Sequence, residues 1–114
     1  RYGDGSTARD YTYIDDIIAG VTSVIELKDL EFDIFNLGGD RVVSLSELIE
    51  AIERAIGKKA IIENFPEQPG DVPLTNCDIS KSQRILGYQP STPIEIGVTN
   101  FVTWFKNQAK ASQD

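Results

Sequence analysis

The chain has 114 residues, 40% of them hydrophobic, and a formal net charge of −7, which together indicate one small acidic globular domain. The isoelectric point of about 4.5 argues against nucleic-acid binding, and no apolar run reaches the roughly 18 residues of a membrane span. The single cysteine, Cys77, excludes an internal disulfide, and with no histidine in the chain we expect no metal site.

The chain begins at Arg1 and contains no methionine, so we expect it to be a fragment of a longer protein. No stretch near Arg1 has the pattern of a signal peptide, which favours a cytoplasmic location.

The first part of the chain is predicted to form a loop, a strand and a helix. Gly-rich polar residues indicate a loop over 1–8, and Tyr and Thr favour a short strand over 9–13. Apolar residues at helical spacing predict a helix over 14–27. Asp15 and Asp16 in its first turn point about 100° apart, so a role at the helix dipole is favoured over acid–base chemistry.

The middle of the chain carries the clearest local signal. A short apolar strand is predicted over 32–37, ending in a Gly-Gly-Asp turn. Ser44 and Glu47 form an S-x-x-E capping box, which predicts a helix over 45–56 that ends at Gly57.

The last part is predicted to contain a strand, a loop and two helices. The strand covers residues 60–65, and three prolines shape a loop over 66–73. Asp78 is the expected cap of a helix over 79–86, closed by a glycine.

A second capping box, Thr92 to Glu95, opens the final predicted helix, which runs to about residue 107. Its core candidates are Ile94, Val98, Phe101, Val102 and Phe105.

The expected fold class is therefore α/β, in a small α+β-like form with a short three-stranded sheet and about four helices. We expect one lobe over residues 1–108 and a polar tail over 109–114. A domain of this size buries only about 60–70% of its unfolded surface, so the core is modest and the lobe is expected to lean on another domain.

Few residues offer chemistry by themselves. No G-x-G-x-x-G or G-x-x-x-x-G-K-S/T motif is present, and Cys77 has no histidine to activate it. Arg9 follows Gly-rich backbone and serves either a surface ion pair or a two-point contact to an anion. Asp71 either caps a turn or accepts hydrogen bonds from vicinal hydroxyls of a ligand, and Tyr2 could stack on a ring.

Four parts of the chain, in order, resemble the C-terminal lobe of extended short-chain dehydrogenase/reductase enzymes, the NAD-dependent nucleotide-sugar epimerases and dehydratases. They are R-Y-G-D-G-S-T-A-R-D-Y-T-Y-I-D-D-I at 1–17, F-N-L-G-G at 35–39, Q-P-G-D-V-P at 68–73 with D-I-S-K at 78–81, and L-G-Y-Q-P at 86–90 with F-V-T-W-F at 101–105. The Q-P-G-D-V-P string looks most like that of UDP-glucuronate 4-epimerases.

The resemblance implies a division of labour. An N-terminal Rossmann lobe would hold NAD and a catalytic Tyr-x-x-x-Lys pair, neither of which is found here, so no catalytic residue is expected in this chain. The C-terminal lobe would bind the nucleotide end of the substrate. By position, Arg9 matches a pyrophosphate contact, Tyr2 an aromatic residue near the nucleobase, Asn36 an asparagine lining the same cleft, and Asp71 the acid that holds the ribose hydroxyls. Gln68 stands where many members have a second phosphate-binding arginine.

The main interpretation is the UDP-sugar-binding lobe of an epimerase, inactive without its Rossmann lobe. Its partners would be a UDP-sugar and that lobe, and the parent would be a homodimer. A 4,6-dehydratase or decarboxylase lobe, a non-catalytic interaction domain of the same fold, and a structural domain without a ligand remain alternatives. A reading frame that continues upstream into a dinucleotide fingerprint would separate the enzyme lobe from the interaction domain, and binding of UDP would exclude the structural domain without a ligand.

Overall fold

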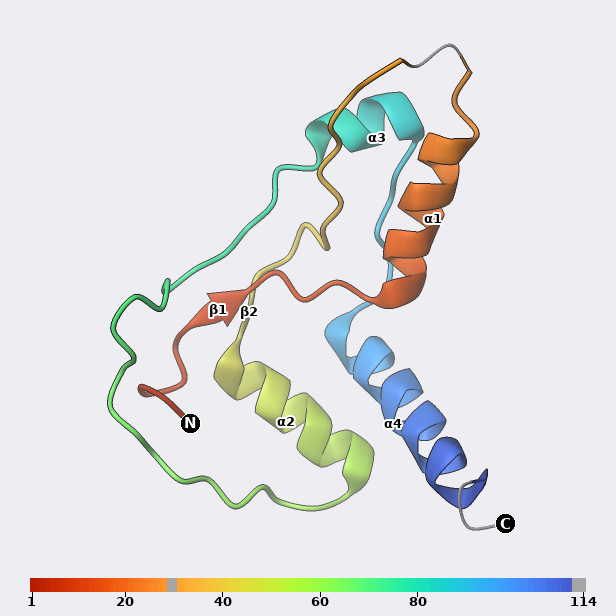
Figure 1. Cartoon of the computed structure of the whole chain (residues 1–114). Helices are drawn as coiled ribbons and strands as arrows, with labels where there is room; N and C mark the ends of the chain where they lie inside the picture. The colour runs from red at the N-terminus through yellow and green to blue at the C-terminus, as the bar shows by residue number, and fades with distance from the viewer. Residues whose placement is uncertain (29–30, 112–114) are drawn as a thin grey trace.

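The computed structural model of the chain describes residues 1–28 and 31–111, with side chains up to residue 108. In these residues, helices α1 and α3 form one half of the molecule, helices α2 and α4 form the other, and two short strands lie between them (Figure 1). The elements are β1 (Ala8–Arg9), α1 (Ile14–Ile25), β2 (Val43–Ser44), α2 (Leu45–Ile56), α3 (Ser80–Leu86) and α4 (Ile94–Ala111).

The sheet is smaller than the sequence predicts. The described residues form one two-stranded sheet, in which β1 pairs antiparallel with β2, Ala8 opposite Ser44 and Arg9 opposite Val43. The prediction of three strands is wrong: of residues 9–13 only Arg9 is in a strand, and residues 32–37 form none. Residues 60–65 contribute a single bridge at Phe65. A β-branched, apolar run becomes a strand only where a second strand lies beside it along its length.

The predicted helix α2 is confirmed residue for residue, because its two ends are determined by local chemistry. Ser44 Oγ accepts the Glu47 N–H at 3.1 Å, and Glu47 Oε2 accepts the Ser44 N–H at 2.8 Å. The Ser44 N–H and the Ser44 hydroxyl, which donates to Glu47 Oε2 at 2.7 Å, together lower the pKa of the Glu47 carboxyl. Gly57 ends the helix at φ +78°, a left-handed conformation that glycine adopts without strain.

Helix α1 ends at Ile25, two residues before its predicted end. Asp16, in its first turn, does more than complement the helix dipole. Its two carboxylate oxygens accept the backbone N–H groups of Ser91 and Thr92 at 3.3 and 3.0 Å. The start of α1 is thereby joined to the segment that leads into α4.

The last two helices differ slightly from prediction. Helix α3 begins at Ser80 rather than at Ile79, and the predicted capping residue Asp78 accepts the Ser80 N–H at 2.9 Å from one position further out. Helix α4 continues to Ala111, so the predicted tail over 109–114 is helical up to that residue, and residues 112–114 lie outside the described part. No helix in the described part of the chain is long and apolar enough to cross a membrane.

The chain buries little of its apolar surface. Among the described residues, the buried apolar side chains are Val43, Ala51, Ile79, Tyr88 and Val102. The prediction that Phe101 and Phe105 belong to the core is wrong for this chain, since each is 59% exposed.

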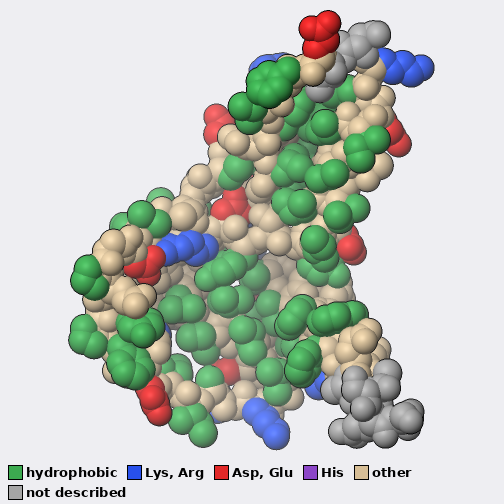
Figure 2. All heavy atoms as spheres, in the orientation of Figure 1, with side chains coloured by type: hydrophobic (Ala, Val, Ile, Leu, Met, Phe, Trp, Pro, Cys, Tyr) green, Lys and Arg blue, Asp and Glu red, His purple; other side chains and the backbone are tan. Residues whose placement is uncertain are grey.

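The overall dimensions agree with this low burial. The radius of gyration is 17.3 Å, whereas a compact domain of this length has about 13 Å. The accessible surface is 8449 Å², against about 6,200 Å² for a folded monomer of this mass. Hydrophobic side chains gather visibly over the region of α2 and α4 (Figure 2).

The capping box gives a direct test of α2. We expect Ser44→Ala to lower the free energy of unfolding by about 1 kcal/mol, because it leaves the Glu47 N–H without its acceptor. The exposed Ser91 provides the control, and Ser91→Ala should change stability by less than about 0.5 kcal/mol. Urea unfolding followed by circular dichroism measures both, and equal effects of the two substitutions would contradict a capping role.

Candidate functional site

The N-terminal segment pairs with residues 65–75, which are more than sixty positions away in sequence, through two parallel bridges, Tyr2 with Phe65 and Ala8 with Leu74. At one end of this pairing, the Gly3 N–H donates to the Phe65 carbonyl at 3.0 Å. At the other end, the Ala8 N–H donates to the Pro73 carbonyl at 2.9 Å. Backbone hydrogen bonds therefore hold β1 and the proline-rich loop side by side.

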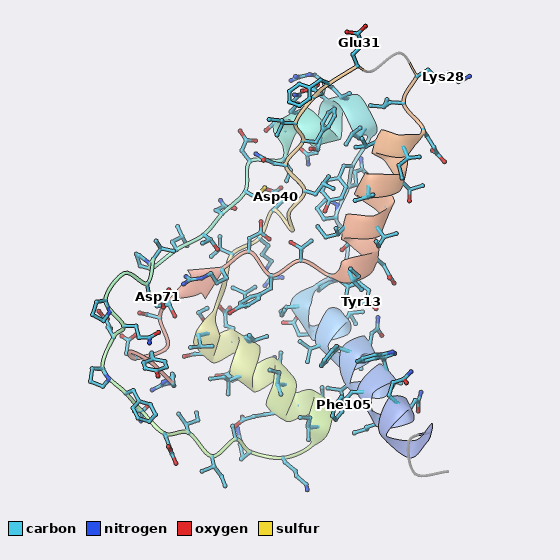
Figure 3. The ribbon with its side chains drawn as sticks, viewed as in Figure 1. Tyr13, Lys28, Glu31, Asp40, Asp71 and Phe105 are labelled. Atoms are coloured by element: carbon cyan, nitrogen blue, oxygen red, sulfur yellow. The ribbon has the colours of Figure 1, made fainter. Side chains whose placement is uncertain are left out.

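This pairing brings together two of the residues singled out in the sequence. Arg9 Nη2 donates to Asp71 Oδ1 at 2.7 Å, forming an ion pair whose side chains are 26% and 46% exposed. Arg9 Nη1 also donates to the Ala8 carbonyl at 2.9 Å, which fixes the plane of the guanidinium. Asp71 lies on the long outer segment next to β1 (Figure 3). The guanidinium and the carboxylate thus form one small polar site at the surface.

Gln68 and Asp71 stand at the two ends of one tight turn. The Asp71 N–H donates to the Gln68 carbonyl at 3.1 Å, and Gly70 between them has φ +87°. Pro69 followed by a glycine at positive φ is the sequence of a type II turn. This turn lies within the loop predicted over 66–73, and it joins the backbone of Gln68 to that of Asp71, the acidic member of the ion pair.

Tyr2 lies at the opposite end of the parallel pairing. Its ring centroid is 5.5 Å from that of Phe65, and Tyr2 remains 49% exposed. One side of the ring is therefore packed while about half of the residue is accessible to a ligand. Phe65 was not predicted as a site residue, and its position just before the proline-rich loop is the signal that could have indicated it.

Asn36 makes its contacts elsewhere. Its Nδ2 donates to the Asp78 carbonyl at 3.3 Å, and its own carbonyl accepts from Ser82 Oγ. Ser82 is completely buried on α3. The hydrogen bonds of Asn36 thus connect residues 34–38 to α3, and none of them joins the Arg9–Asp71 pair.

Asp10 is a residue whose role sequence reasoning missed. Its Oδ1 accepts the Gly39 N–H at 2.7 Å, whereas its Oδ2 is buried without a hydrogen-bond partner among the described residues. A Cβ at Gly38 would lie 2.6 Å from Asp10 Oδ2 and 2.7 Å from Cys77 Cβ, so glycine is required there by space. Asp10 therefore fixes the Gly38–Gly39 turn against β1.

Two titratable groups beside this turn have raised pKa values. Burial, followed by the nearby carboxylate of Asp10, raises the pKa of Cys77. Burial also raises the pKa of Tyr88, whose hydroxyl donates to the Gly38 carbonyl at 2.9 Å. Both groups stay protonated at neutral pH, and the described residues contain no group of three or more His, Cys, Asp or Glu placed to hold a metal ion.

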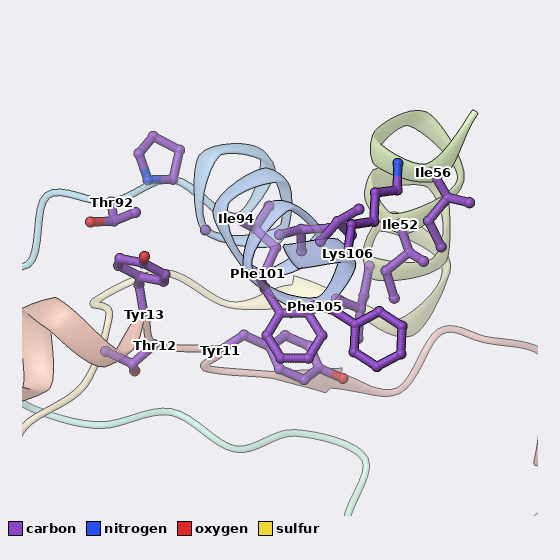
Figure 4. A pocket seen from close by; sticks show the side chains of 15 residues that line it. Tyr11, Thr12, Tyr13, Ile52, Ile56, Thr92, Ile94, Phe101, Phe105 and Lys106 are labelled. Carbon is purple, nitrogen blue, oxygen red and sulfur yellow. The ribbon is translucent and has the colours of Figure 1, made fainter. Parts of the chain in front are cut away.

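A second surface feature is an apolar groove between α2 and α4, with a volume of about 530 Å³ (Figure 4). Its walls include Ile52 and Ile56 of α2 and Phe101 and Phe105 of α4, with Tyr11 beside them. The aromatic residues that were predicted to form the core are therefore the lining of an open groove.

Comparison with known proteins identifies relatives of this chain. No protein-family model matches it. A UDP-glucuronate 4-epimerase from Thermodesulfobacterium geofontis is 44% identical over 106 residues, which cover 92% of this chain and 32% of that protein. UDP-glucuronate 4-epimerase 4 from Arabidopsis thaliana is 36% identical over 115 residues, covering 89% of the chain and 26% of that protein.

Over about nine tenths of its length, this chain is similar in sequence to UDP-glucuronate 4-epimerases. The resemblance seen in the sequence is thereby confirmed, and the chain spans about a third of the length of the curated relatives it matches.

Solved structures agree with this assignment. UDP-glucuronic acid 4-epimerase from Bacillus cereus, in complex with UDP-glucuronic acid and NAD, matches 91% of this chain and 34% of its own, with a TM-score of 0.80 and 31% identity. UDP-glucose 4-epimerase from Thermotoga maritima, with UDP-glucose, matches 96% of this chain and 35% of its own, with a TM-score of 0.85 and 28% identity. The chain therefore has the fold of about a third of each of these epimerases.

The buried Ser82 hydroxyl, which donates to the Asn36 backbone carbonyl, can be tested by mutation. Ser82→Ala removes the donor to the Asn36 carbonyl, and we expect a loss of about 1–3 kcal/mol in the free energy of unfolding. Ser82→Cys, which keeps a weak donor of similar size, should lose less. Denaturant unfolding measures both, and an unchanged midpoint for Ser82→Ala would show that this hydrogen bond does not hold the segment in place.

Proposed function

We propose that this chain is the substrate-binding lobe of an NAD-dependent nucleotide-sugar 4-epimerase acting on a UDP-sugar of the glucuronate type. The observation that carries the proposal is the ion pair of Arg9 and Asp71. Backbone hydrogen bonds hold this pair at one end of the pairing between the N-terminal segment and residues 65–75, with Gln68 in the same turn as Asp71. The exposed ring of Tyr2 lies at the other end of that pairing. Relatives of this chain are UDP-glucuronate 4-epimerases, and one homologous structure contains UDP-glucuronic acid and NAD.

Each residue has a chemical role in the proposed site. The Arg9 guanidinium provides the planar donors that match two phosphate oxygens. Asp71 accepts hydrogen bonds from the vicinal ribose hydroxyls, and Tyr2 offers its accessible face to the nucleobase. Gln68 donates an amide N–H to the phosphate without adding charge. The role of Asn36 rests on the resemblance alone, since its hydrogen bonds connect residues 34–38 to α3.

The chain itself does not fit an NAD site. Its described helices follow Tyr13, Ser44, Ile79 and Pro93, and none of them begins in a Gly-rich loop that would cradle a pyrophosphate. In our proposal, NAD and the catalytic Tyr-x-x-x-Lys pair belong to the remaining two thirds of the polypeptide. When bound there, NAD supplies hydride transfer at the sugar.

The task of this lobe is to hold the nucleotide end of the substrate. A 4-epimerase must expose both faces of the sugar in turn, so the sugar rotates while the nucleotide stays fixed. Binding energy gained far from the reacting carbon can position that carbon without taking part in the chemistry.

We further propose that the Rossmann lobe of the same polypeptide covers the groove between α2 and α4. Three observations support it: the groove is lined almost entirely by apolar side chains, Phe101 and Phe105 are each 59% exposed, and relatives are about three times as long as this chain. Contiguous exposed apolar surface of this kind marks an interaction site.

The isolated chain should not turn over UDP-sugars. It lacks a dinucleotide site and a catalytic Tyr/Lys pair, so UDP-glucuronate with added NAD should remain unchanged in a purified sample. Chromatography of the sugar nucleotides measures this, and the full-length polypeptide is the positive control. Formation of the C4 epimer by the isolated chain would contradict the proposed division of labour.

Arg9 tests the anchor directly. In the full-length polypeptide, Arg9→Ala should weaken UDP-sugar binding about 10- to 100-fold, because a charge-assisted hydrogen bond to a water-excluded ligand is lost. Arg9→Lys should recover part of the loss, since an ammonium cannot make the planar two-point contact. NAD affinity should not change.

The control is Arg54→Ala, which removes an equally charged but exposed side chain on α2. Isothermal titration with UDP measures all three variants. A dissociation constant for Arg9→Ala within about two-fold of wild type, with the fold intact by circular dichroism, would refute the anchor role.

A further inference from the structure

We propose that Asp71 makes the anion site selective for nucleoside diphosphates over free phosphate and pyrophosphate. It does so by occupying Arg9 until a ligand provides new partners for both side chains. This inference deepens the proposed function and depends on it. Asp71 is then a specificity-determining residue as well as a ribose contact.

The first step is that the ion pair is held in place on both sides. The Phe65 N–H donates to the Arg1 carbonyl at 2.7 Å before the loop, and the Ala8 N–H donates to the Pro73 carbonyl at 2.9 Å after it. The loop between these points is short and contains prolines and a tight turn. Asp71 therefore meets Arg9 without a large loss of chain entropy when the site is empty.

The second step concerns what an incoming anion must do. Arg9 Nη2 already donates to Asp71 Oδ1, and Nη1 already donates to the Ala8 carbonyl. A bare phosphate that takes over Nη2 leaves the Asp71 carboxylate without its counter-charge and places a second anion beside it. The pair is only partly exposed, so water screens this repulsion incompletely.

The third step is that a nucleoside diphosphate avoids this cost. Its phosphate replaces the carboxylate at Arg9, and its ribose hydroxyls replace the guanidinium as donors to Asp71. Both partners of the broken ion pair then have new hydrogen bonds. The same carboxylate that opposes a bare anion favours an anion that carries a ribose.

Charge near the site makes the effect stronger. Residues 66–73 contain Glu67 and Asp71 but no lysine or arginine, and Gln68 is neutral. Loss of the Asp71 charge therefore releases Arg9 for any anion.

The experiment compares two ligands in the full-length polypeptide saturated with NAD. Isothermal titration gives the affinities of inorganic pyrophosphate and of UDP for wild type and for Asp71→Asn. We expect Asp71→Asn to bind pyrophosphate about 3- to 10-fold more tightly, because the competing carboxylate is gone. The same variant should bind UDP about 3- to 10-fold more weakly, because the ribose loses a charged acceptor.

Glu67→Gln is the matched control, since it removes one negative charge from the same loop without touching the ion pair. It should change either affinity by less than about two-fold. If Asp71→Asn does not fold, Asp71→Ser carries the same test.

The outcomes separate the two proposals. If UDP does not bind to wild type, both the proposed function and this inference are overturned. If UDP binds but Asp71→Asn leaves pyrophosphate affinity unchanged, or if Glu67→Gln tightens it equally, the proposed function stands and the selectivity role of Asp71 is overturned. Opposite changes for the two ligands in Asp71→Asn alone support the inference.

Discussion

The pairing of the N-terminal segment with residues 65–75 is the interaction on which the rest of the site depends. It places Arg9 2.7 Å from Asp71, 62 residues further along the chain, and Tyr2 against Phe65. On its other side, the segment pairs with β2, and β2 leads directly into the capping box of α2. The first nine residues thus join the proline-rich loop to the helical part of the molecule.

The features that were predictable from sequence are those whose cause lies within a few residues. Helix α2 follows from the reciprocal hydrogen bonds of Ser44 and Glu47, and its end from the left-handed conformation of Gly57. The strands follow from long-range pairing, which a single sequence does not contain. Residues 60–65 have the composition of a strand, yet only Phe65 forms a bridge with the N-terminal segment, and Ile61 is 98% exposed. Arg9 and Asp71 were each singled out from the sequence. Their contact was not predicted, because it joins residues that lie 62 positions apart.

Polar contacts connect several elements of this chain, which buries little apolar surface. Few apolar side chains are buried, and several connections between the elements are instead single hydrogen bonds, such as Tyr88 to the Gly38 carbonyl and Asp16 to the backbone before α4. Such bonds give direction and spacing but each contributes only about 0.5–1.5 kcal/mol. In our proposal, the Rossmann lobe covers the apolar groove between α2 and α4 and so removes from water part of the apolar surface that this chain leaves exposed.

The charge of the chain constrains how the proposed site can gain affinity. A net charge of −7 repels an anionic sugar nucleotide at long range, and the guanidinium nearest the loop is already neutralised by Asp71. Long-range attraction therefore contributes little here, and in our proposal the affinity comes from direct contacts. These are the hydrogen bonds of Arg9 to the phosphate, together with contacts that a bare phosphate lacks, namely a base against Tyr2 and hydroxyls on Asp71. A site of this kind holds the nucleotide by its shape and hydrogen bonds, which is what a substrate needs if its sugar is to turn while the other end remains fixed.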